Sequence, residues 1–357
     1  MKIVVAMSGG VDSSVVAGLM AEAGHEVIGI TLQLYDHGAA VGRKGACCAG
    51  QDIHDARRVA DKLGIAHYVI DSEQKFRGSV ISAFADSYAG GETPVPCIAC
   101  NQHLKFGDLL SMARDLGADA LATGHYVRRI EGRDGAELHQ AVDAERDQSW
   151  FLFATTREQL EYCRFPLGEM RSKADVRQEA ARLGLQVAVK PDSQDICFVP
   201  SGSYAEIVGK YRPDALEPGE IVSESGAMLG RHQGIARYTI GQAKRLGNAA
   251  VQDGESMVVR RIEPATRRIV IGPRQAASRE VKLRDVNWLI EKPEGPIRAA
   301  VKLRARQELQ PAEIMTDDNA ASLLLDTAAL AAPGQAAVFY AGSRILGGGF
   351  IAACGGV

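Results

Sequence analysis

The stretch that decides the fold is KIVVAMSGGVDSSVVAGLMAEAG, residues 2–24. It begins with an apolar run rich in β-branched residues, Lys2–Met7, which predicts a short buried strand. A polar glycine-rich turn follows, and Ser13–Ala23 then carries apolar residues at helical spacing until Gly24. A strand that leads through such a turn directly into a helix is typical of a parallel α/β sheet.

The same alternation continues to about residue 125. We predict further strands at Val27–Leu34, His67–Ile70 and Ala120–Thr123, and helices at Asp52–Leu63 and Leu104–Leu116. Strands that alternate with helices pair in parallel through right-handed crossovers. The expected fold class is therefore α/β, with a doubly wound parallel sheet.

The pattern changes after this region. A hairpin is predicted from Tyr126–Ile130 and Glu137–Val142, and helices at Trp150–Thr155 and Lys173–Leu183. From about residue 205, short apolar runs alternate with Gly, Pro and Asp turns, which predicts β-rich structure. We expect an ATP-binding catalytic domain at 1–204, a small central β-rich domain at 205–278 and a C-terminal β-barrel at 279–357.

Composition limits the class of protein. The chain has 357 residues, 46% hydrophobic and 24% charged, which is ordinary globular composition. No apolar run reaches the roughly 18–20 residues that cross a bilayer, and no signal peptide is recognisable. The seven cysteines are an odd number in a large chain, which argues against a secreted disulfide framework. We therefore expect a cytoplasmic protein without a membrane association.

Charge is distributed unevenly along the chain. The net charge is −3, but residues 231–310 hold 17 Lys and Arg against 8 Asp and Glu, a local net charge of +9. The rest of the chain then carries −12. This asymmetry indicates either a surface that faces a polyanion or a scattered solvated basic surface.

The turn itself, SGGVDSS at residues 8–14, has the features of an anion cradle. Its glycines let the backbone approach a ligand, and the serine hydroxyls and the positive end of the following helix converge on one place. The turn lacks the Gly-Lys-Ser/Thr ending of a Walker A loop. It resembles the PP-loop family, whose members cleave ATP between the α- and β-phosphates and adenylate an oxygen of their substrate.

That resemblance implies ATP and Mg²⁺ as cofactors. The ATP contacts that it implies are Ala6, Met7, Ser8, Gly9, Gly10, Val11, Asp12, Ser13, Leu32 and Gly124. Asp12 would also be a catalytic residue, either at the metal or at the pyrophosphate, and the sequence leaves that choice open.

Two cysteine-containing segments stand out downstream. TPVPCIACN, residues 93–101, frames Cys97 and Cys100 with prolines just before a predicted helix, where the helix dipole favours a thiolate. DSQDICF, residues 192–198, places Cys197 in a polar loop. An activated carbonyl needs a nucleophile, and these thiols are the candidates.

With these segments the resemblance narrows. The order SGGVDSS, PCIACN with KFG, ATGHY, DQSWFLF, KPDSQDICF and GRHQGIARYTIGQ resembles the bacterial tRNA-specific 2-thiouridylases. The resemblance implies a sulfurtransferase that adenylates the C2 oxygen of the wobble uridine. Sulfur would come from a persulfide on Cys197, delivered by an upstream sulfur relay and cysteine desulfurase, and Cys100 would form a transient disulfide with Cys197.

Two routes stay open at that step. The persulfide can attack C2 directly, or Cys100 can attack first and release hydrosulfide. The sequence also departs from a common family pattern, because Val95 and Cys97 stand where many members have Asn and Asp. Cys97 and Cys100 with Cys47 and Cys48 would offer four thiolates to zinc, which is an alternative reading of these residues.

The resemblance further implies tRNA contacts, with the anticodon loop as the partner. They are Val95, Pro96, Cys97, His125, Arg146, Asp147, Gln148, Arg304, Ala305 and Gln335. A strand through Val301–Gln307 would place Arg304 and Arg306 on one face. We expect a monomer, since nothing in the sequence requires an oligomer.

Two other functions remain to be distinguished. A PP-loop ligase that adenylates a carboxylate or amide would not need paired thiols at Cys100 and Cys197. A non-catalytic RNA-binding protein would bind tRNA without forming AMP and pyrophosphate.

Overall fold

The computed structural model describes residues 1–35, 48–191, 196–199, 203–252, 254–274 and 278–353. By its internal contacts the chain divides into two compact units. The first contains Met1–Ser79, Cys97–Gln194 and Ala341–Leu346, and the second contains Val80–Pro96, Asp195–Tyr340 and Gly347–Val357. The boundary between Pro96 and Cys97 thus falls inside the segment TPVPCIACN, residues 93–101, which is called the cysteine loop from here on.

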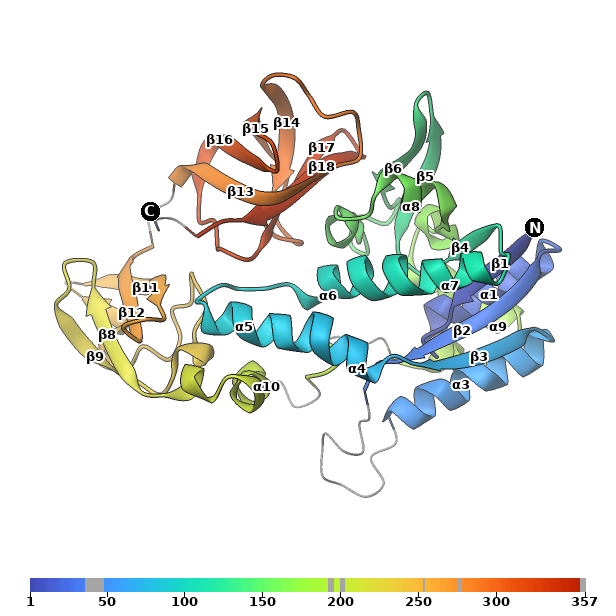
Figure 1. Cartoon of the computed structure of the whole chain (residues 1–357), viewed down its shortest axis with the longest axis horizontal. Helices are drawn as coiled ribbons and strands as arrows, with labels where there is room; N and C mark the ends of the chain where they lie inside the picture. Colours follow the sequence, from blue (N-terminus) through green and yellow to red (C-terminus); the bar gives the residue numbers. More distant parts are fainter. Residues whose placement is uncertain (36–47, 192–195, 200–202, 253, 275–277, 354–357) are drawn as a thin grey trace. The chain divides into compact units, whose positions relative to one another are not determined.

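The first unit is built on a five-stranded sheet, of which Figure 1 labels β1 to β4 on the right. Its strands are β1 (Lys2–Ala6), β2 (Glu26–Gln33), β3 (Ala66–Asp71), β4 (Ala120–Ala122) and β7 (Cys163–Arg164). They lie in the order β3-β2-β1-β4-β7, and every neighbouring pair is parallel. The predicted parallel sheet is confirmed. Because the chain goes from β1 outward to β3 and returns to β4 on the other side, the topological switch point lies between β1 and β4.

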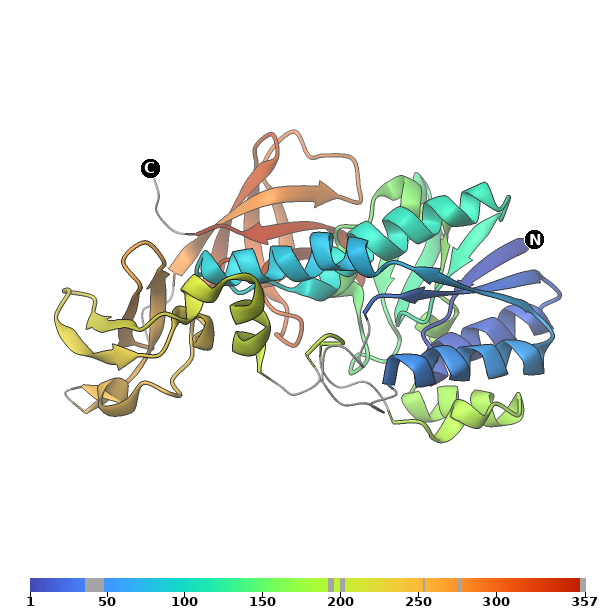
Figure 2. The same cartoon turned by 60° about the horizontal axis from the view of Figure 1, so that its bottom comes forward.

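Helices cover both faces of this sheet, as Figure 2 shows. On one face α1 (Val11–Glu22) contacts both α3 (Cys48–Leu63) and α9 (Lys173–Arg182). The long helical segment made of α6 (Pro96–Ala99), the π-helix η2 (Cys100–Leu109) and α7 (Leu110–Asp115) lies on the other face, with α7 against β4. Helix α1 begins at Val11, two residues before the predicted start.

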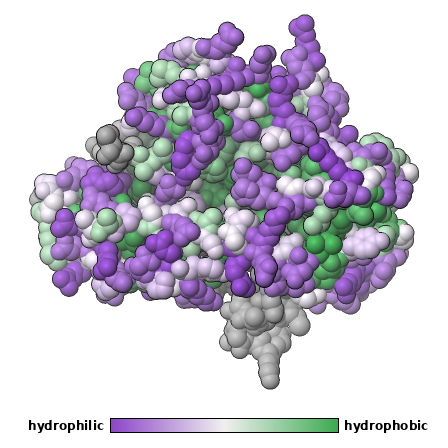
Figure 3. All heavy atoms as spheres, viewed as in Figure 1, coloured by the Kyte–Doolittle hydropathy of each residue, from purple (hydrophilic) through white to green (hydrophobic). Residues whose placement is uncertain are grey.

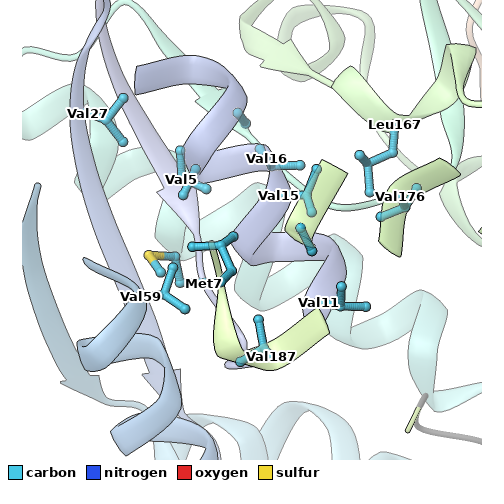
Figure 4. Packing of buried hydrophobic residues seen from close by; sticks show 14 of the residues in the cluster. Val5, Met7, Val11, Val15, Val16, Val27, Val59, Leu167, Val176 and Val187 are labelled. Atoms are coloured by element: carbon cyan, nitrogen blue, oxygen red, sulfur yellow. The ribbon is translucent and has the colours of Figure 1, made fainter. Parts of the chain in front are cut away.

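A hydrophobic core lies between α1 and the sheet. Val5, Val15 and Val16 are fully buried together with side chains from α3 and α9, as Figure 4 shows. Burying each such side chain contributes about 1.5–3 kcal/mol. The packed core therefore holds the turn between β1 and α1 in place.

The remaining elements of the first unit are short. They are α4 (Glu73–Phe76), η1 (Arg77–Ser82, which continues into the second unit), η3 (Ser149–Leu152), α8 (Arg157–Tyr162), η4 (Pro166–Glu169) and η5 (Gln186–Val189). The predicted hairpin is confirmed as β5 (Val127–Gly132) and β6 (Gly135–Gln140). The predicted helix at Trp150–Thr155 is instead the single 3₁₀ turn η3, which ends at Leu152.

The second unit contains a five-stranded sheet with the order β10-β11-β12-β8-β9. Its strands are β8 (Gly219–Ser223), β9 (Met228–His232), β10 (Val251–Gln252), β11 (Glu255–Glu263) and β12 (Arg268–Pro273). Helices α5 (Ala83–Ala89) and α10 (Tyr204–Tyr211) pack on one another, and the turns η6 (Pro213–Leu216), η7 (Ile235–Arg237) and η8 (Gly247–Ala250) connect the rest. Helix α10 was not predicted, because its apolar residues span only two turns.

The last strands of the chain close into a barrel. They are β13 (Ser278–Trp288), β14 (Ile297–Lys302), β15 (Gln310–Thr316), β16 (Ala320–Ala329), β17 (Ala336–Ala341) and β18 (Arg344–Ile351). They follow the order β13-β16-β15-β14-β17-β18, and β13 also pairs with β18, which closes the cylinder. The expected C-terminal barrel is confirmed.

Among the described residues, none of the helices has the length and apolar character needed to cross a membrane. Hydrophilic side chains cover most of the face seen in Figure 3.

Candidate functional site

The glycine turn between β1 and α1 is shaped by its own hydroxyl groups. The backbone N–H of Ser8 donates to Ser13 Oγ (3.1 Å), and the hydroxyls of Ser13 and Ser14 donate to the carbonyl of Gly10 (3.2 and 2.8 Å). Gly10 begins the helix in an extended conformation without a side-chain cap. The first amides of α1 are thus left for a ligand, and the helix dipole favours an anion there.

Gly9 is required by its surroundings. Its φ of +75° lies in the left-handed region, and a Cβ would sit 2.1 Å from the carbonyl oxygen of Asp52 in α3. Lys190 holds the other side, because its ammonium donates to the Gly9 carbonyl (2.9 Å) and to the carboxylates of Asp52 (2.7 Å) and Asp55 (2.6 Å). The backbone of the turn therefore packs directly on α3, and only glycine fits.

Asp12 faces a partly buried cation, Lys173, at the start of α9. The Lys173 ammonium, at the start of α9, lies 2.7 Å from each carboxylate oxygen, and the Tyr126 hydroxyl donates to Oδ1 (2.6 Å). The side chain of Lys173 is only 12% exposed and that of Asp12 is 32% exposed. This is a charged pair at the mouth of the turn, next to where phosphates would be held.

Gly124 lies on the other side of the switch point, directly after β4. A Cβ there would be 3.1 Å from both the Cβ of Asp12 and the backbone nitrogen of Ser13. Gly124 thus allows the end of β4 to approach the helix start. Of the other predicted ATP contacts, Met7 and Val11 are buried in the core, so only their backbone groups face the turn.

The two thiols of the cysteine loop lie on one helical segment. Cys97 in α6 is exposed, and Cys100 begins η2 and is 8% exposed. Burial raises the pKa of the Cys100 thiol, and the Lys105 ammonium opposes that effect. Desolvation also raises the pKa of Cys97, again opposed by Lys105. Burial therefore opposes the thiolate that the helix start is expected to favour, and that expectation stays a prediction.

Lys105 is oriented by His125. Its ammonium lies 3.4 Å from His125 Nε2, and His125 Nδ1 lies 2.8 Å from the Thr123 hydroxyl. Phe106 and Phe165 pack around the imidazole. Burial, followed by the Lys105 charge, lowers the pKa of His125 well below its usual range, so the ring is neutral and its Nε2 accepts.

Asp147 and Gln148, two of the predicted tRNA contacts, organise the chain around the hairpin. Asp147 accepts from the backbone of Ala141 and of Ser149 (3.1 Å each) and from the Ser149 hydroxyl (2.8 Å). Gln148 accepts from the Tyr126 N–H (3.0 Å) through its side chain. Neighbouring Arg146 is partly exposed. The local contacts of Asp147 and Gln148 are therefore structural.

In the second unit, the barrel holds the start of the cysteine loop. The Gln335 amide donates to the Thr93 carbonyl (2.7 Å), and the Thr93 N–H donates to the Pro333 carbonyl (2.7 Å). Arg284 on β13 pairs with Glu92 (2.9 Å). Val95 is partly buried and Pro96 buried. Gln335, expected to contact tRNA, thus positions the backbone just before Val95.

Arg304 and Ala305 lie in a turn and not on the predicted strand. β14 ends at Lys302, and the N–H of Gln307 donates back to the Arg304 carbonyl. The turn exposes Arg304 and Arg306 while Leu303 stays buried. Within the described part of the chain, neither arginine has an ion-pair partner within 4.0 Å.

Part of the remaining basic stretch is paired with carboxylates. The ion pairs include Arg260–Glu224, Arg267–Glu217, Arg268–Glu220, Arg284–Glu92, Lys292–Asp318 and Arg298–Asp326. The local net charge of +9 therefore overstates the positive surface of this region.

Cys197 is exposed and belongs to the second unit. The next residue, Phe198, is buried edge-on against Phe84 of α5, with ring centroids 5.4 Å apart. This anchor leaves the thiol outside the core. Cys100 belongs to the first unit, so the transient Cys100–Cys197 disulfide stays a prediction.

The zinc alternative depends on residues outside this description. Cys47 and the side chain of Cys48 lie outside the described residues. Among the described side chains, no group of three or more His, Cys, Asp or Glu residues is placed to hold a metal ion.

Sequence reasoning missed the cations of the site, namely Lys105, Lys173 and Lys190, and the hydroxyl of Tyr126. Lys190 is the first residue of the motif KPDSQDICF, and Lys105 is the first residue of KFG. Their places in these motifs could have marked both lysines as candidate site residues. Lys173 had none, because it reaches Asp12 across 161 residues of sequence.

The comparisons with known proteins cover nearly all of the chain. Family models match it in three parts, described as tRNA methyl transferase HUP domain (residues 1–201), tRNA methyl transferase PRC-barrel domain (205–273) and aminomethyltransferase beta-barrel domain (278–351). A solved 4-thiouridine synthetase–RNA complex with bound ATP aligns at a TM-score of 0.34 and 16% identity, over 60% of this chain and 50% of that one, too weak a likeness to support an argument.

Curated relatives are much more similar. The chain is 72% identical to the tRNA-specific 2-thiouridylase MnmA of Acidiphilium cryptum, over 98% of this chain and 100% of the relative. It is 63% identical to that of Gluconobacter oxydans (99% of each chain) and 58% identical to that of Rhodospirillum centenum (98% of this chain, 91% of the relative). The chain therefore belongs to the family of tRNA-specific 2-thiouridylases.

Proposed function

We propose that this sulfurtransferase activates the C2 oxygen of the wobble uridine with ATP and then replaces it by sulfur carried on Cys197. The observation that supports this most is the glycine turn at the switch point of a parallel sheet, in one compact unit with the Cys97–Cys100 loop. The turn suits an α-phosphate, and the loop suits sulfur chemistry.

Different residues in and around the turn have different roles in the proposed binding of ATP. The amides of Gly9, Gly10 and the first turn of α1 hold phosphate oxygens, and Lys190 keeps the turn against α3. Lys173 balances the negative charge that grows at the α-phosphate when pyrophosphate leaves. Mg²⁺ would enter with the phosphates, near Asp12, and would neutralise part of their charge.

The sulfur step uses the two cysteines in sequence. Uridine O2 displaces pyrophosphate from ATP and becomes an adenylate, so that AMP is the leaving group at C2. The terminal sulfur of the Cys197 persulfide then reaches C2, either directly or as hydrosulfide released by Cys100. Both routes end in a Cys100–Cys197 disulfide. Lys105 assists by favouring the Cys100 thiolate.

The RNA side of the proposal rests on residues that are exposed or partly exposed. We propose that Arg304 and Arg146 meet backbone phosphates of the anticodon loop, and that Cys97 and Val95 lie near the target base. His125, Asp147 and Gln148 act by supporting this surface, and Gln335 by fixing the loop that presents it.

Partners and cellular setting complete the proposal. We propose that a cysteine desulfurase, through a sulfur relay, charges Cys197 with sulfur, that the enzyme acts as a monomer and that it works in the cytoplasm. Analytical ultracentrifugation with and without tRNA checks the monomer, since a sedimentation coefficient that rises with protein concentration would contradict it.

The test separates the two half-reactions. Unmodified tRNA is incubated with ATP, Mg²⁺ and persulfide-charged enzyme, while pyrophosphate is measured and 2-thiouridine is quantified by nucleoside mass spectrometry. Cys100→Ala and Cys197→Ala should still release pyrophosphate but yield no 2-thiouridine. Cys163→Ala removes a buried thiol of the first unit and should retain both signals. Thiolation that survives in Cys100→Ala would refute the proposed role of that thiol.

A further inference from the structure

The cysteine loop holds two thiols where the proposed chemistry needs only one. Cys97 lies three residues before Cys100 on the same helical segment, in the same compact unit. Residues three apart on a helix face the same side, with Cβ atoms about 5–6 Å apart. The pair forms a C-x-x-C at the start of a helical segment, an arrangement that favours dithiol exchange.

The two thiols differ in access. Cys97 is exposed, whereas Cys100 is 8% exposed. In the proposed Cys100–Cys197 disulfide, the sulfur of Cys100 would be poorly accessible to an external reductant, because Cys100 is buried. A disulfide between Cys97 and Cys100 would include the more exposed residue of the pair, so a reductant would have a less shielded position to attack.

Formation of a Cys97–Cys100 disulfide requires the two thiols to approach more closely than helix geometry places them. A disulfide needs Cβ atoms roughly 3.5–4.5 Å apart, somewhat closer than two positions on a regular helix. Cys97 is the second residue of the four-residue helix α6, and it follows directly on the boundary between the two units. Closing the pair therefore requires a local change in the first turn, which precedes Cys100 in η2.

The same cation, Lys105, acts on the pKa of both thiols. The Lys105 ammonium lowers the pKa of each, against the burial that raises it. A cation that favours either thiolate helps both the attack on a disulfide and the departure from one.

We propose that Cys97 resolves the Cys100–Cys197 disulfide, an inference that rests on the proposed function. The Cys97 thiolate attacks Cys100 Sγ, a Cys97–Cys100 bond forms and the Cys100–Cys197 bond breaks. Cys197 leaves as a thiolate and takes up a proton, ready for a new persulfide. The number of disulfides does not change, and a dithiol reductant later opens Cys97–Cys100 while its own thiols are oxidised to a disulfide.

The experiment identifies which cysteines are linked after one turnover. Reduced enzyme is charged with inorganic polysulfide, freed of donor, and given ATP, Mg²⁺ and unmodified tRNA without reductant. It is then quenched in acid, alkylated and digested with trypsin for non-reducing mass spectrometry. Residues 78–105 form one tryptic peptide, so a Cys97–Cys100 bond is internal to it, whereas a Cys100–Cys197 bond joins two peptides.

The expected product in the wild type is the internal bond, in about tenfold excess over the cross-link. Cys97→Ser should invert that ratio. The matched control is Cys97→Ser with Ala99→Cys, which restores the number of thiols but puts one next to Cys100, where neighbouring residues do not face each other. It should behave as Cys97→Ser does. Omitting tRNA should leave both bonds unformed.

The outcomes distinguish this inference from the proposed function. If 2-thiouridine forms and the wild type ends with the Cys100–Cys197 cross-link, the role of Cys97 is refuted and the proposed function stands. An internal bond that forms equally without tRNA also refutes it, since that bond is then simple oxidation. If the wild type forms no 2-thiouridine, the proposed function fails and this inference fails with it.

Discussion

Replacing Gly9 by alanine gives the sharpest test of how the glycine turn is built. The new Cβ would lie 2.1 Å from the Asp52 carbonyl oxygen, and the residue would have to hold a φ of +75°. The left-handed conformation costs an alanine about 1–2 kcal/mol. Pushing α3 or the turn aside adds about 1–3 kcal/mol. We therefore expect a loss of about 2–5 kcal/mol in stability.

Gly10→Ala is the matched control. Gly10 has a φ of −91°, which alanine adopts freely, and its Cβ would meet only Ser8 Oγ at an ordinary 3.6 Å. The gain from a stiffer unfolded chain and the loss of a glycine N-cap nearly cancel. We expect the stability of this variant to stay within about 1 kcal/mol of the wild type.

The assay is thermal unfolding of the enzyme without ATP, followed by circular dichroism and by intrinsic fluorescence. At about 2–4 °C per kcal/mol, Gly9→Ala should lower the melting temperature by roughly 4–20 °C, and Gly10→Ala should leave it nearly unchanged. Measuring without nucleotide keeps ligand contacts out of the comparison. Equal melting temperatures for Gly9→Ala and the wild type, or equal losses in both variants, would refute the packing of this turn on α3.

Three further changes test the surrounding groups. Lys173→Met removes the ammonium that contacts Asp12 and leaves the Tyr126 hydroxyl in place. It should reduce tRNA-dependent pyrophosphate release at least about a hundredfold, because the negative charge at the α-phosphate is no longer balanced. A wild-type rate would exclude that role of Lys173. Lys105→Met should raise the pKa of Cys100 further above the ordinary thiol range, so that its alkylation by iodoacetamide needs a higher pH, and Lys105→Arg should restore the wild-type profile. An unshifted pH profile would show that Lys105 does not act on the thiol. Thr156→Ala breaks the capping box with Gln159 and should cost about 1 kcal/mol of stability without weakening ATP binding, measured by calorimetry.

The buried thiol of Cys163 is the internal reference for the alkylation experiment. Burial raises its pKa to about 12, with nearby arginines opposing the shift. At every pH where the enzyme is folded and Cys100 reacts, Cys163 should stay unmodified. Labelling of Cys163 would indicate that the sample has unfolded.

The sequence alone determined the parts of the fold that depend on short-range chemistry. The apolar run at Lys2–Met7, the glycine turn and the helix after it follow from backbone sterics and from periodicities of two and 3.6 residues. Those rules act within a few residues, so the strands and three of the helices in the first 125 residues could be predicted, whereas the helical segment Glu73–Ala89 was missed. The cysteine loop and the barrel were recognised by the same local signals, and the three-domain division stays a prediction.

What the sequence missed is set by distances that only the folded chain creates. Lys173 reaches Asp12 across 161 residues, because the α9 helix returns to the sheet edge where α1 begins. Lys105, in the π-helix that begins at Cys100, acts electrostatically on both thiols, and Phe106 and Phe165 pack around His125, whose pKa is lowered by burial. The charge state of a thiol or an imidazole depends on how much water its neighbours remove. Those neighbours are brought together by the crossovers of the sheet, and a linear pattern of residues does not contain them.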